Sequence, residues 1–388
     1  MRASSISAVV YQELKKRMGI DTPTKTADSM QILAEVEMEV VDRLEIDVLP
    51  LDVSGAAWAG MDASQGRRKK LFCGNEVVFP PDTRIAEEAQ GDWVLLDASD
   101  RPYARMPKDG LYFDFIRPTM AGRKIDPKAF KPSDTIAEKD LRTLSERAKF
   151  LHENTDKAVL GWGPSISMLG LSALLSDNIT QGCLDEWLIM MVAEKETAHE
   201  MMGRYVEAVI KRTELCHEAI GDNCMVWGVA SDDAGTQRDV LMSADVFAEM
   251  VKPHYKRLCD WVHRNTNWKT FLHTCGSVYK YIPHWIEAGV DILNPVQISA
   301  ANMQPRKLMG EFGGKIVFWG GGCDTQHYLP NRIPEEIREH VRENMSVFGP
   351  GEGGYVFTQV HNIQPDVPVE NVEAMLGAAR EFAGCGVE

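Results

Sequence analysis

The sequence lacks a long hydrophobic run and an excess of positive charge. No stretch of its 388 residues approaches the ~18 consecutive apolar residues that identify a membrane span. The first residues have no apolar core followed by a small-residue cleavage site, so we expect no signal peptide. The net charge of −15 argues against nucleic-acid and anionic membrane partners. One short basic run, residues 66–70, is typical of an exposed loop or hairpin.

Two further absences narrow the class of protein. The eight cysteines are scattered, and a chain this long does not need a disulfide framework, so we expect a reducing cytoplasm with thiols free for metal chemistry. No Gly-rich phosphate fingerprint opens a helix, which disfavours a dinucleotide-binding fold. The sequence has no fixed repeat. Its 44% apolar and 26% charged residues are ordinary for a globular protein.

From about residue 155 onward, short apolar runs alternate with longer amphipathic segments. The runs are continuously apolar, which is typical of parallel strands that are buried on both faces. The predicted strands cover residues 158–162, 224–229, 270–273, 291–294, 316–319 and 355–358, and an earlier one covers residues 47–51.

The segments between these strands carry apolar residues at helical spacing. The longest predicted helix spans residues 194–220, and another spans residues 246–262 with a break at Pro253. Further helices are predicted for residues 5–18, 28–44, 276–289 and 334–347, and for a last segment from residue 368 onward. Residues 66–120 instead read as a β-hairpin excursion. We expect residues 1–388 to form a single domain.

Seven strands that alternate with helices favour an α/β fold of the (β/α)8 TIM-barrel type over a doubly wound sheet. In such a barrel the chemistry lies at the C-terminal ends of the strands. His273 and Cys275 follow one predicted strand, Cys323 follows another, and His361 follows the last. Imidazole and thiolate are ligands that zinc prefers, so these strand ends are candidate metal positions.

Other polar residues follow the same strands. Asp232 and Asp233 are adjacent carboxylates, so one is expected to have a raised pKa or to orient a metal ligand; a turn or helix-cap role is the alternative. Asn362 is a further catalytic candidate. Side chains suited to recognition of a small polar or aromatic substrate are Asn294, Gln297, Trp319, Gln326 and Gln364. The tryptophans at 162, 227 and 319 could stack on a substrate ring or belong to the core.

At these residues the sequence resembles the uroporphyrinogen decarboxylase superfamily, and within it the corrinoid-protein-dependent methyltransferases of the O-demethylase type. The matching stretches are Trp162-Gly163-Pro164-Ser165, Ser231-Asp232-Asp233-Ala234-Gly235, His273-Thr274-Cys275-Gly276-Ser277, Asn294-Pro295-Val296-Gln297, Gly320-Gly321-Gly322-Cys323-Asp324 and Val360-His361-Asn362-Ile363-Gln364. The resemblance implies a barrel of that type. Relatives carry a first barrel strand before the helix that corresponds to residues 5–18, whereas this sequence begins at that helix. Two alternatives follow: the given start lies late, or the barrel closes in another way without this strand.

The resemblance also implies an activity. The enzyme would move a methyl group from a small methylated compound, such as a methoxylated aromatic, to a corrinoid carried by a partner protein. His273 and Cys275 match the H-x-C zinc ligands of these methyltransferases. His361 stands where the third ligand, a cysteine, lies in those relatives, and Cys323 is the competing third ligand. A homodimer is one option for its assembly.

Two other functions remain open. The first is metal-independent decarboxylation of a small carboxylic acid or a tetrapyrrole. That reaction predicts a cluster of basic residues inside the barrel, for which the candidates are Arg117, Arg204, Arg238 and Arg306. The chain lacks the N-terminal arginine-rich segment of true decarboxylases, which weakens a porphyrinogen substrate. The second is a non-catalytic barrel that binds a ligand or a partner.

Overall fold

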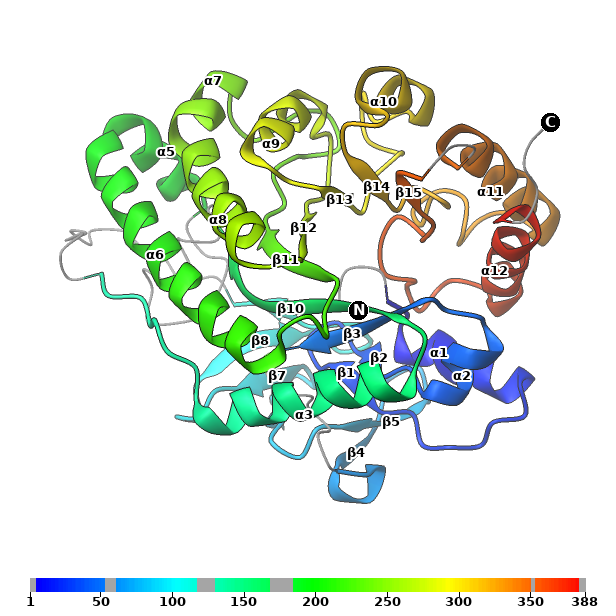
Figure 1. Cartoon of the computed structure of the whole chain (residues 1–388). Coiled ribbons are helices and arrows are strands. Elements are labelled where there is room, and N and C mark those ends of the chain that lie inside the picture. The colour runs from blue at the N-terminus through cyan, green and yellow to red at the C-terminus, as the bar shows by residue number, and fades with distance from the viewer. Residues whose placement is uncertain (1–4, 53–60, 117–129, 168–183, 350–352, 384–388) are drawn as a thin grey trace.

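The computed structural model describes residues 5–52, 61–116, 130–167, 184–349 and 353–383. Its centre is a curled sheet of seven parallel strands with helices around it (Figure 1). In spatial order the strands are β15 (Tyr355–Val356), β14 (Val317–Trp319), β13 (Ile292–Asn294), β12 (Lys269–His273), β11 (Val226–Ser231), β10 (Ala158–Ile166) and β3 (Val48–Asp52). This is the (β/α)-barrel architecture expected from the sequence, and each predicted strand corresponds to an observed one.

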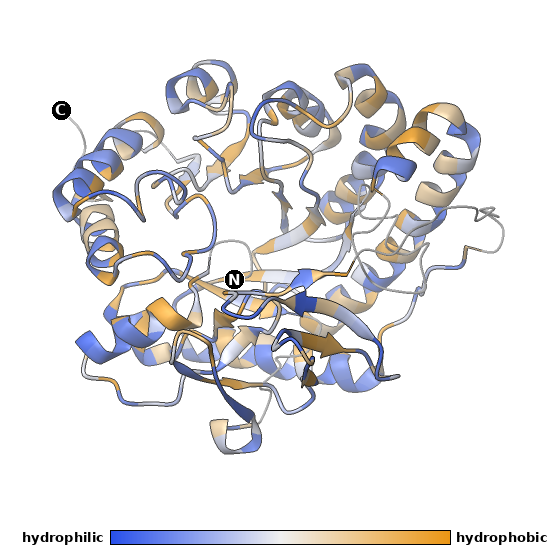
Figure 2. Cartoon of the chain, turned by 180° about the vertical axis from the view of Figure 1, so that it is seen from behind, coloured by the Kyte–Doolittle hydropathy of each residue, from blue (hydrophilic) through white to orange (hydrophobic). Residues whose placement is uncertain are grey.

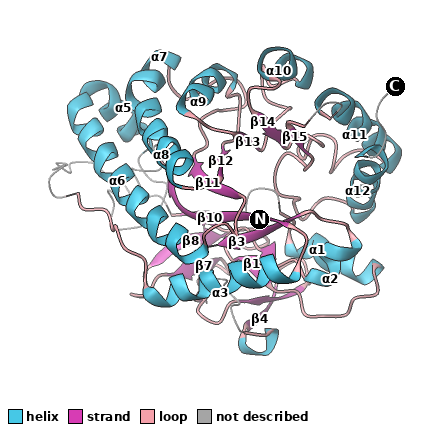
Figure 3. Cartoon of the chain, viewed as in Figure 1, coloured by secondary structure: helices cyan, strands magenta, loops and turns pink. Residues whose placement is uncertain are grey.

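Helices cover the outer face of the sheet, as Figure 3 shows. They are α3 (Glu138–Asn154), α5 (Leu184–Ala193), α6 (Lys195–Ile220), α7 (Ala244–Val246), α8 (Lys252–Asn265), α9 (Ile282–Ala288), α10 (Pro305–Phe312), α11 (Pro334–Phe348) and α12 (Val369–Ala383). A π-helical turn, Phe247–Val251, joins α7 to α8, and Pro253 lies in the first turn of α8. Proline is tolerated there because first-turn N–H groups have no partner within the helix. The break predicted at Pro253 is therefore confirmed.

Two reciprocal glycine–tryptophan pairs join β10 to β11. Gly161 lies opposite Trp227, and Trp162 lies opposite Gly228. A Cβ atom at Gly161 would come within 2.4 Å of the Trp227 ring, and one at Gly228 within 2.5 Å of the Trp162 ring. The glycines therefore make room for the indoles. Trp227 packs between the sheet and the helices, whereas Trp162 packs with Phe271 and Trp319 in the barrel interior.

The N-terminal part differs from its prediction in one place. The helix predicted over residues 5–18 is observed as α1 (Ala8–Arg17). The prediction of a single helix over residues 28–44 is wrong. The chain instead forms β1 (Thr26–Asp28), β2 (Leu33–Ala34) and a short α2 (Met38–Arg43). Asp28 resembles a helix cap in the sequence, but its carboxylate closes a turn by accepting the N–H of Gln31 at 2.9 Å.

The predicted β excursion is present. Its strands are β4 (Arg67–Lys70), β5 (Glu76–Phe79), β6 (Ile85–Glu87), β7 (Trp93–Leu96), β8 (Pro102–Met106) and β9 (Asp114–Phe115). The basic run is the exposed strand β4, which pairs with β5 in a hairpin. In Figure 2 the strands of the central sheet are mostly orange or pale, whereas the helices mix blue and orange residues. The described helices include none with the length and apolar character of a membrane span.

Candidate metal centre

His273 is the last residue of β12, and it is 8% exposed. Its Nδ1 lies 2.8 Å from the Oδ1 of Asn294, at the end of the neighbouring strand β13. The Asn294 amide donates its own N–H to the Trp319 carbonyl at 3.0 Å, which assigns Oδ1 as the acceptor for the histidine. The proton therefore lies on Nδ1, and the lone pair of Nε2 is available to a metal.

Cys275 and His361 lie beside this nitrogen. The Sγ of Cys275 is 3.7 Å from His273 Nε2, and the rings of His273 and His361 have centroids 5.7 Å apart. The ligand atoms of all three residues lie within 4.8 Å of one another. Among the described residues, none forms a hydrogen bond to the His361 ring. Two imidazoles and one thiol thus form a group that could hold a metal ion.

Burial sets the protonation of these groups in the absence of a metal. Burial raises the pKa of the Cys275 thiol well above its usual value, and the nearby Asp233 carboxylate raises it further. Burial lowers the pKa of His361 to about 4, and the His273 ring adds to the effect. His361 is therefore a neutral ligand at neutral pH, whereas Cys275 must release a proton when it binds a cation.

The two adjacent aspartates have different roles. Asp232 is 5% exposed and accepts hydrogen bonds from the hydroxyls of Ser167 at 2.9 Å and Tyr255 at 2.6 Å. Asp233 has a side chain that is 65% exposed. Its Oδ1 accepts the N–H of Cys275 at 3.1 Å and lies 4.0 Å from His273 Nε2. Asp232 therefore stabilises the loop after β11, whereas Asp233 is the carboxylate that faces the ligand group.

A close backbone contact fixes the loop after β12. Gly276 has a φ of 94°, which favours glycine, and a Cβ there would lie 2.1 Å from the carbonyl oxygen of Gly235. The Gly276 N–H donates to the Gln297 side chain at 2.7 Å. Gln297 donates in turn to Gln326 at 3.1 Å. Two residues predicted to contact substrate thus support the Cys275 loop.

The remaining candidates lie elsewhere. Cys323 is completely buried in the apolar cluster formed with the N-terminal helix and is not part of the ligand group. The Asn362 side chain accepts the N–H of Ser5 at 2.7 Å and donates to Gln31 at 2.7 Å. Gln364 donates to the carbonyl of Asn362 at 3.3 Å. Trp319 packs edge-on against Phe271 in the barrel interior. Asn362 and Gln364 thus anchor the loop that carries His361.

Sequence reasoning missed Tyr255 and Ser167, the two hydroxyl donors to Asp232. Tyr255 lies on α8, far along the chain from the aspartate. Its position looks like any other apolar position of an amphipathic helix, so no motif or spacing indicates its hydrogen bond. Burial and Asp232 raise the pKa of Tyr255 well above its usual value, so the hydroxyl stays protonated and donates.

The fold and the ligand group together place this protein among (β/α)-barrel proteins that have a candidate metal centre at the C-terminal ends of their strands. The model of the uroporphyrinogen decarboxylase (URO-D) family matches residues 115–382. This is more than half of the chain, and the protein belongs to that family.

One curated protein and one solved structure are similar to this chain. The chain is 27% identical over 202 residues to a uroporphyrinogen decarboxylase of Serratia proteamaculans (strain 568), and the match spans about half of each protein (50% and 51%). Its fold is similar to that of a methyltransferase from Methanosarcina mazei, with a TM-score of 0.55 and 16% identity over 98% of this chain and 94% of the other. This identity is low, so the likeness shows the fold alone.

Proposed function

We propose that the protein is a methyltransferase that moves a methyl group from a small methylated compound to a corrinoid carried by a partner protein. The observation that carries the proposal is the group of His273, Cys275 and His361 at the barrel mouth. Three protein ligands of this chemistry fit zinc and leave a fourth position for substrate, as in catalytic zinc sites. Zinc held there would supply Lewis-acid polarisation of the heteroatom that bears the methyl group.

The residues around the ligand group have separate tasks in this proposal. Asn294 holds the His273 ring in the tautomer that presents Nε2 to the site. Gln297 holds the backbone that carries Cys275. Asp233 is exposed and adjacent to both ligands, so its carboxyl group can take up a proton from solvent and deliver it to the substrate heteroatom as the methyl group leaves and negative charge develops there. Asp232, bonded to Tyr255, keeps the Asp233 loop in place.

The corrinoid would be delivered by another protein. The chain has no phosphate-binding fingerprint that would hold a nucleotide-bearing cofactor of its own. The Asp233 side chain is largely exposed, so the mouth is open on the side where a corrinoid would have to approach. A methoxylated aromatic is the proposed methyl donor, because the H-x-C pair of His273 and Cys275 resembles that of methyltransferases of the O-demethylase type.

Decarboxylation is the alternative that the name of the curated relative favours. It requires basic residues that bind a substrate carboxylate. Arg204 is paired with Glu200 on α6, and Arg238 and Arg306 are exposed. Arg117 lies outside the described residues. None of these three candidate arginines is buried in the barrel interior, where decarboxylation would require them. The group of His273, Cys275 and His361 therefore favours methyl transfer over decarboxylation.

Spectroscopy of the corrinoid tests the proposal. The protein would be mixed with a reduced corrinoid protein and a panel of methoxylated aromatics and methylamines, and formation of methylcobalt would be followed by its visible spectrum. We expect methylcobalt with at least one donor and no decarboxylation of uroporphyrinogen. The Cys275→Ser variant is the control and should be inactive with the same donor. Decarboxylase activity without any methylcobalt would support the alternative.

A further inference from the structure

His340 lies on α11 and accepts two hydrogen bonds at one ring nitrogen. Its Nε2 accepts the backbone N–H of Asp324 at 3.2 Å and the side-chain N–H of Asn344, also at 3.2 Å. The same Asn344 nitrogen donates to the Gly322 carbonyl at 3.3 Å, which assigns it as a donor. The proton of His340 therefore lies on Nδ1, and the ring is neutral.

Asp324 connects this histidine to the loop of Cys275. The buried Asp324 carboxylate accepts the backbone N–H of Gln326 at 2.8 Å. The Gln326 side chain accepts the amide N–H of Gln297 at 3.1 Å, and Gln297 accepts the N–H of Gly276 at 2.7 Å. Gly276 directly follows Cys275. A continuous set of hydrogen bonds thus joins α11 to the Cys275 loop.

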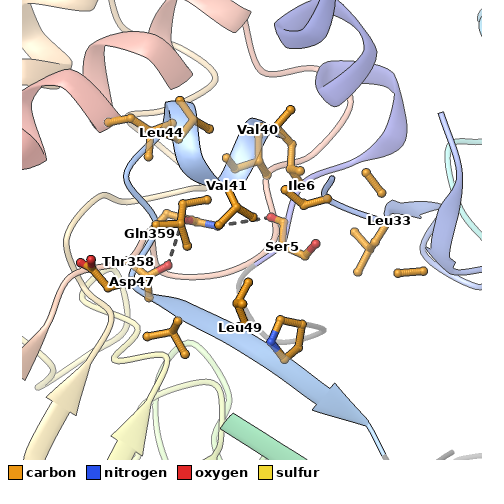
Figure 4. A pocket seen from close by; sticks show the side chains of 18 of the residues that line it. Ser5, Ile6, Leu33, Val40, Val41, Leu44, Asp47, Leu49, Thr358 and Gln359 are labelled. Atoms are coloured by element: carbon orange, nitrogen blue, oxygen red, sulfur yellow. Dashed lines mark hydrogen bonds between the residues drawn. The ribbon is translucent and has the colours of Figure 1, made fainter. Parts of the chain in front are cut away.

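The loop after β14 also supports the segment that carries His361. Val360 donates its N–H to the carbonyl of Cys323 at 2.9 Å, next to the N–H that His340 holds. Figure 4 shows Gln359 donating to Ser5 at a cavity of about 1870 Å³ between β3 and β15. Among the described strands β15 pairs only with β14, so the loop after β14 supplies the backbone support on its paired side.

We propose that His340 is a positioning residue that holds the loops of Cys275 and His361 in place and releases them when its ring takes up a proton. A proton on Nε2 would face the N–H of Asp324, so this hydrogen bond and the one from Asn344 would both be lost. The proposal adds control by pH to the ligand group, and it rests on the proposed function only for its effect on turnover.

The charged groups around His340 act in opposite directions. Burial lowers the pKa of His340, and the carboxylates of Asp324 and Glu343 oppose this effect in part. The neutral ring is therefore favoured at neutral pH and is lost on acidification. The other titratable or charged groups near the ring are Tyr328, which stacks on it, Arg332, which lies over Tyr328, and His327, which pairs with Asp324.

Amide hydrogen exchange in the zinc-free full chain tests the proposal. The reporters are the N–H groups of Gly276 and Val360, whose protection is measured from about pH 7.5 to about pH 5, on both sides of the ordinary histidine pKa of ~6.5. In the wild type we expect protection to fall about tenfold on acidification, the scale of a lost hydrogen bond. His340→Gln keeps an acceptor and takes up no proton, so protection should stay constant. His340→Leu has no acceptor and should show low protection throughout.

Zinc affinity and a matched variant separate positioning from general stability. Val341→Ala, at the next and fully buried position of α11, should lower stability and leave the pH dependence at Gly276 unchanged. His340→Leu should weaken zinc binding about tenfold, at the lower end of the effect of groups that support metal ligands. His340→Gln should bind zinc as the wild type does.

Three results would overturn the proposal. Protection in the wild type could be independent of pH, or it could depend on pH equally in His340→Gln, which would assign the titration to another group such as His273. Equal protection in the wild type and His340→Leu would show that the loops do not depend on this histidine. If His340→Leu does not fold, the comparison with His340→Gln decides alone. The exchange measurement requires neither zinc nor a methyl donor, so failure of the proposed function leaves its outcome unaffected.

Discussion

The two sides of this barrel differ in how completely their strands are paired. On the side of β11, β12 and β13, strands pair on both edges and their C-terminal ends are tied by buried hydrogen bonds, including His273 to Asn294 and Tyr255 to Asp232. On the other side, β15 and β3 face a cavity, and the loop beyond β15 is held by Ser5 and by backbone hydrogen bonds to Gly322 and Cys323. We therefore expect the paired side to open less readily than the side that faces the cavity.

The candidate metal centre bridges these two sides. His273 and Cys275 come from the paired side, whereas His361 comes from the open side. The first two ligands are held by hydrogen bonds from Asn294 and Gln297. The position of His361 depends instead on the loop that Asn362 anchors to Ser5 and Gln31. This difference predicts that perturbing the paired side affects chemistry and stability strongly, whereas perturbing the open side has smaller effects.

The largest expected effect in the chemistry comes from Asp233, on the paired side. Asp233→Asn should reduce turnover by ~10²-fold or more, because the amide cannot take up a proton and deliver it to the heteroatom that loses the methyl group. Its melting temperature should stay close to that of the wild type, since the side chain is largely exposed and packs little. Normal turnover with a lowered melting temperature would show instead that Asp233 is a structural turn residue.

Core truncation compares the two sides directly. Leu272→Ala, at a fully buried position of β12, should cost about 2–5 kcal/mol in the free energy of unfolding. Val356→Ala on β15 should cost only about 1 kcal/mol, because this partly exposed side chain lines the cavity between β3 and β15. Urea unfolding of both variants measures the difference. Equal costs would mean that the open side is packed as tightly as the paired side.

The loss of folding stability in acid is expected to be a smaller effect. Burial lowers the pKa of His361 on the open side and of His254 on α8 to about 4 each, against ~6.5 in an unfolded chain. The unfolded state therefore binds more protons between these values, and stability should fall as the pH falls from about 6.5 to about 4. Urea unfolding of zinc-free protein across this range should show the loss. His361→Gln should reduce it, whereas His152→Gln, at an exposed position on α3, should not.

Much of this architecture could be predicted from the sequence. The parallel strands are continuously apolar, so β11 to β14 and the helices after them follow from local pattern alone. The helix predicted over residues 28–44 was wrong because turn formation at Asp28 and pairing of β1 with β2 depend on neighbours that the pattern does not show. Family resemblance indicated His361, but only the fold brings it beside His273.

The supporting contacts could not be predicted. The hydrogen bonds from Tyr255 to Asp232 and from Asn362 to Ser5 join residues that are distant in the chain and carry no motif. The residues Gln297 and Gln326 were expected at a substrate, yet their side chains bond to each other and to the Cys275 loop. Strand-end position thus indicates where polar residues gather, and it does not indicate which of them touch substrate.

The most direct test of the account is the zinc content and zinc affinity of protein purified without chelators or nickel. We expect about one zinc per chain in the wild type and a loss of affinity by orders of magnitude in Cys275→Ser, because a hydroxyl is a poor ligand for zinc. Cys323→Ala is the matched control and should keep its zinc, since Cys323 lies outside the ligand group. Wild-type protein that neither contains zinc nor takes it up at micromolar concentration would contradict the account.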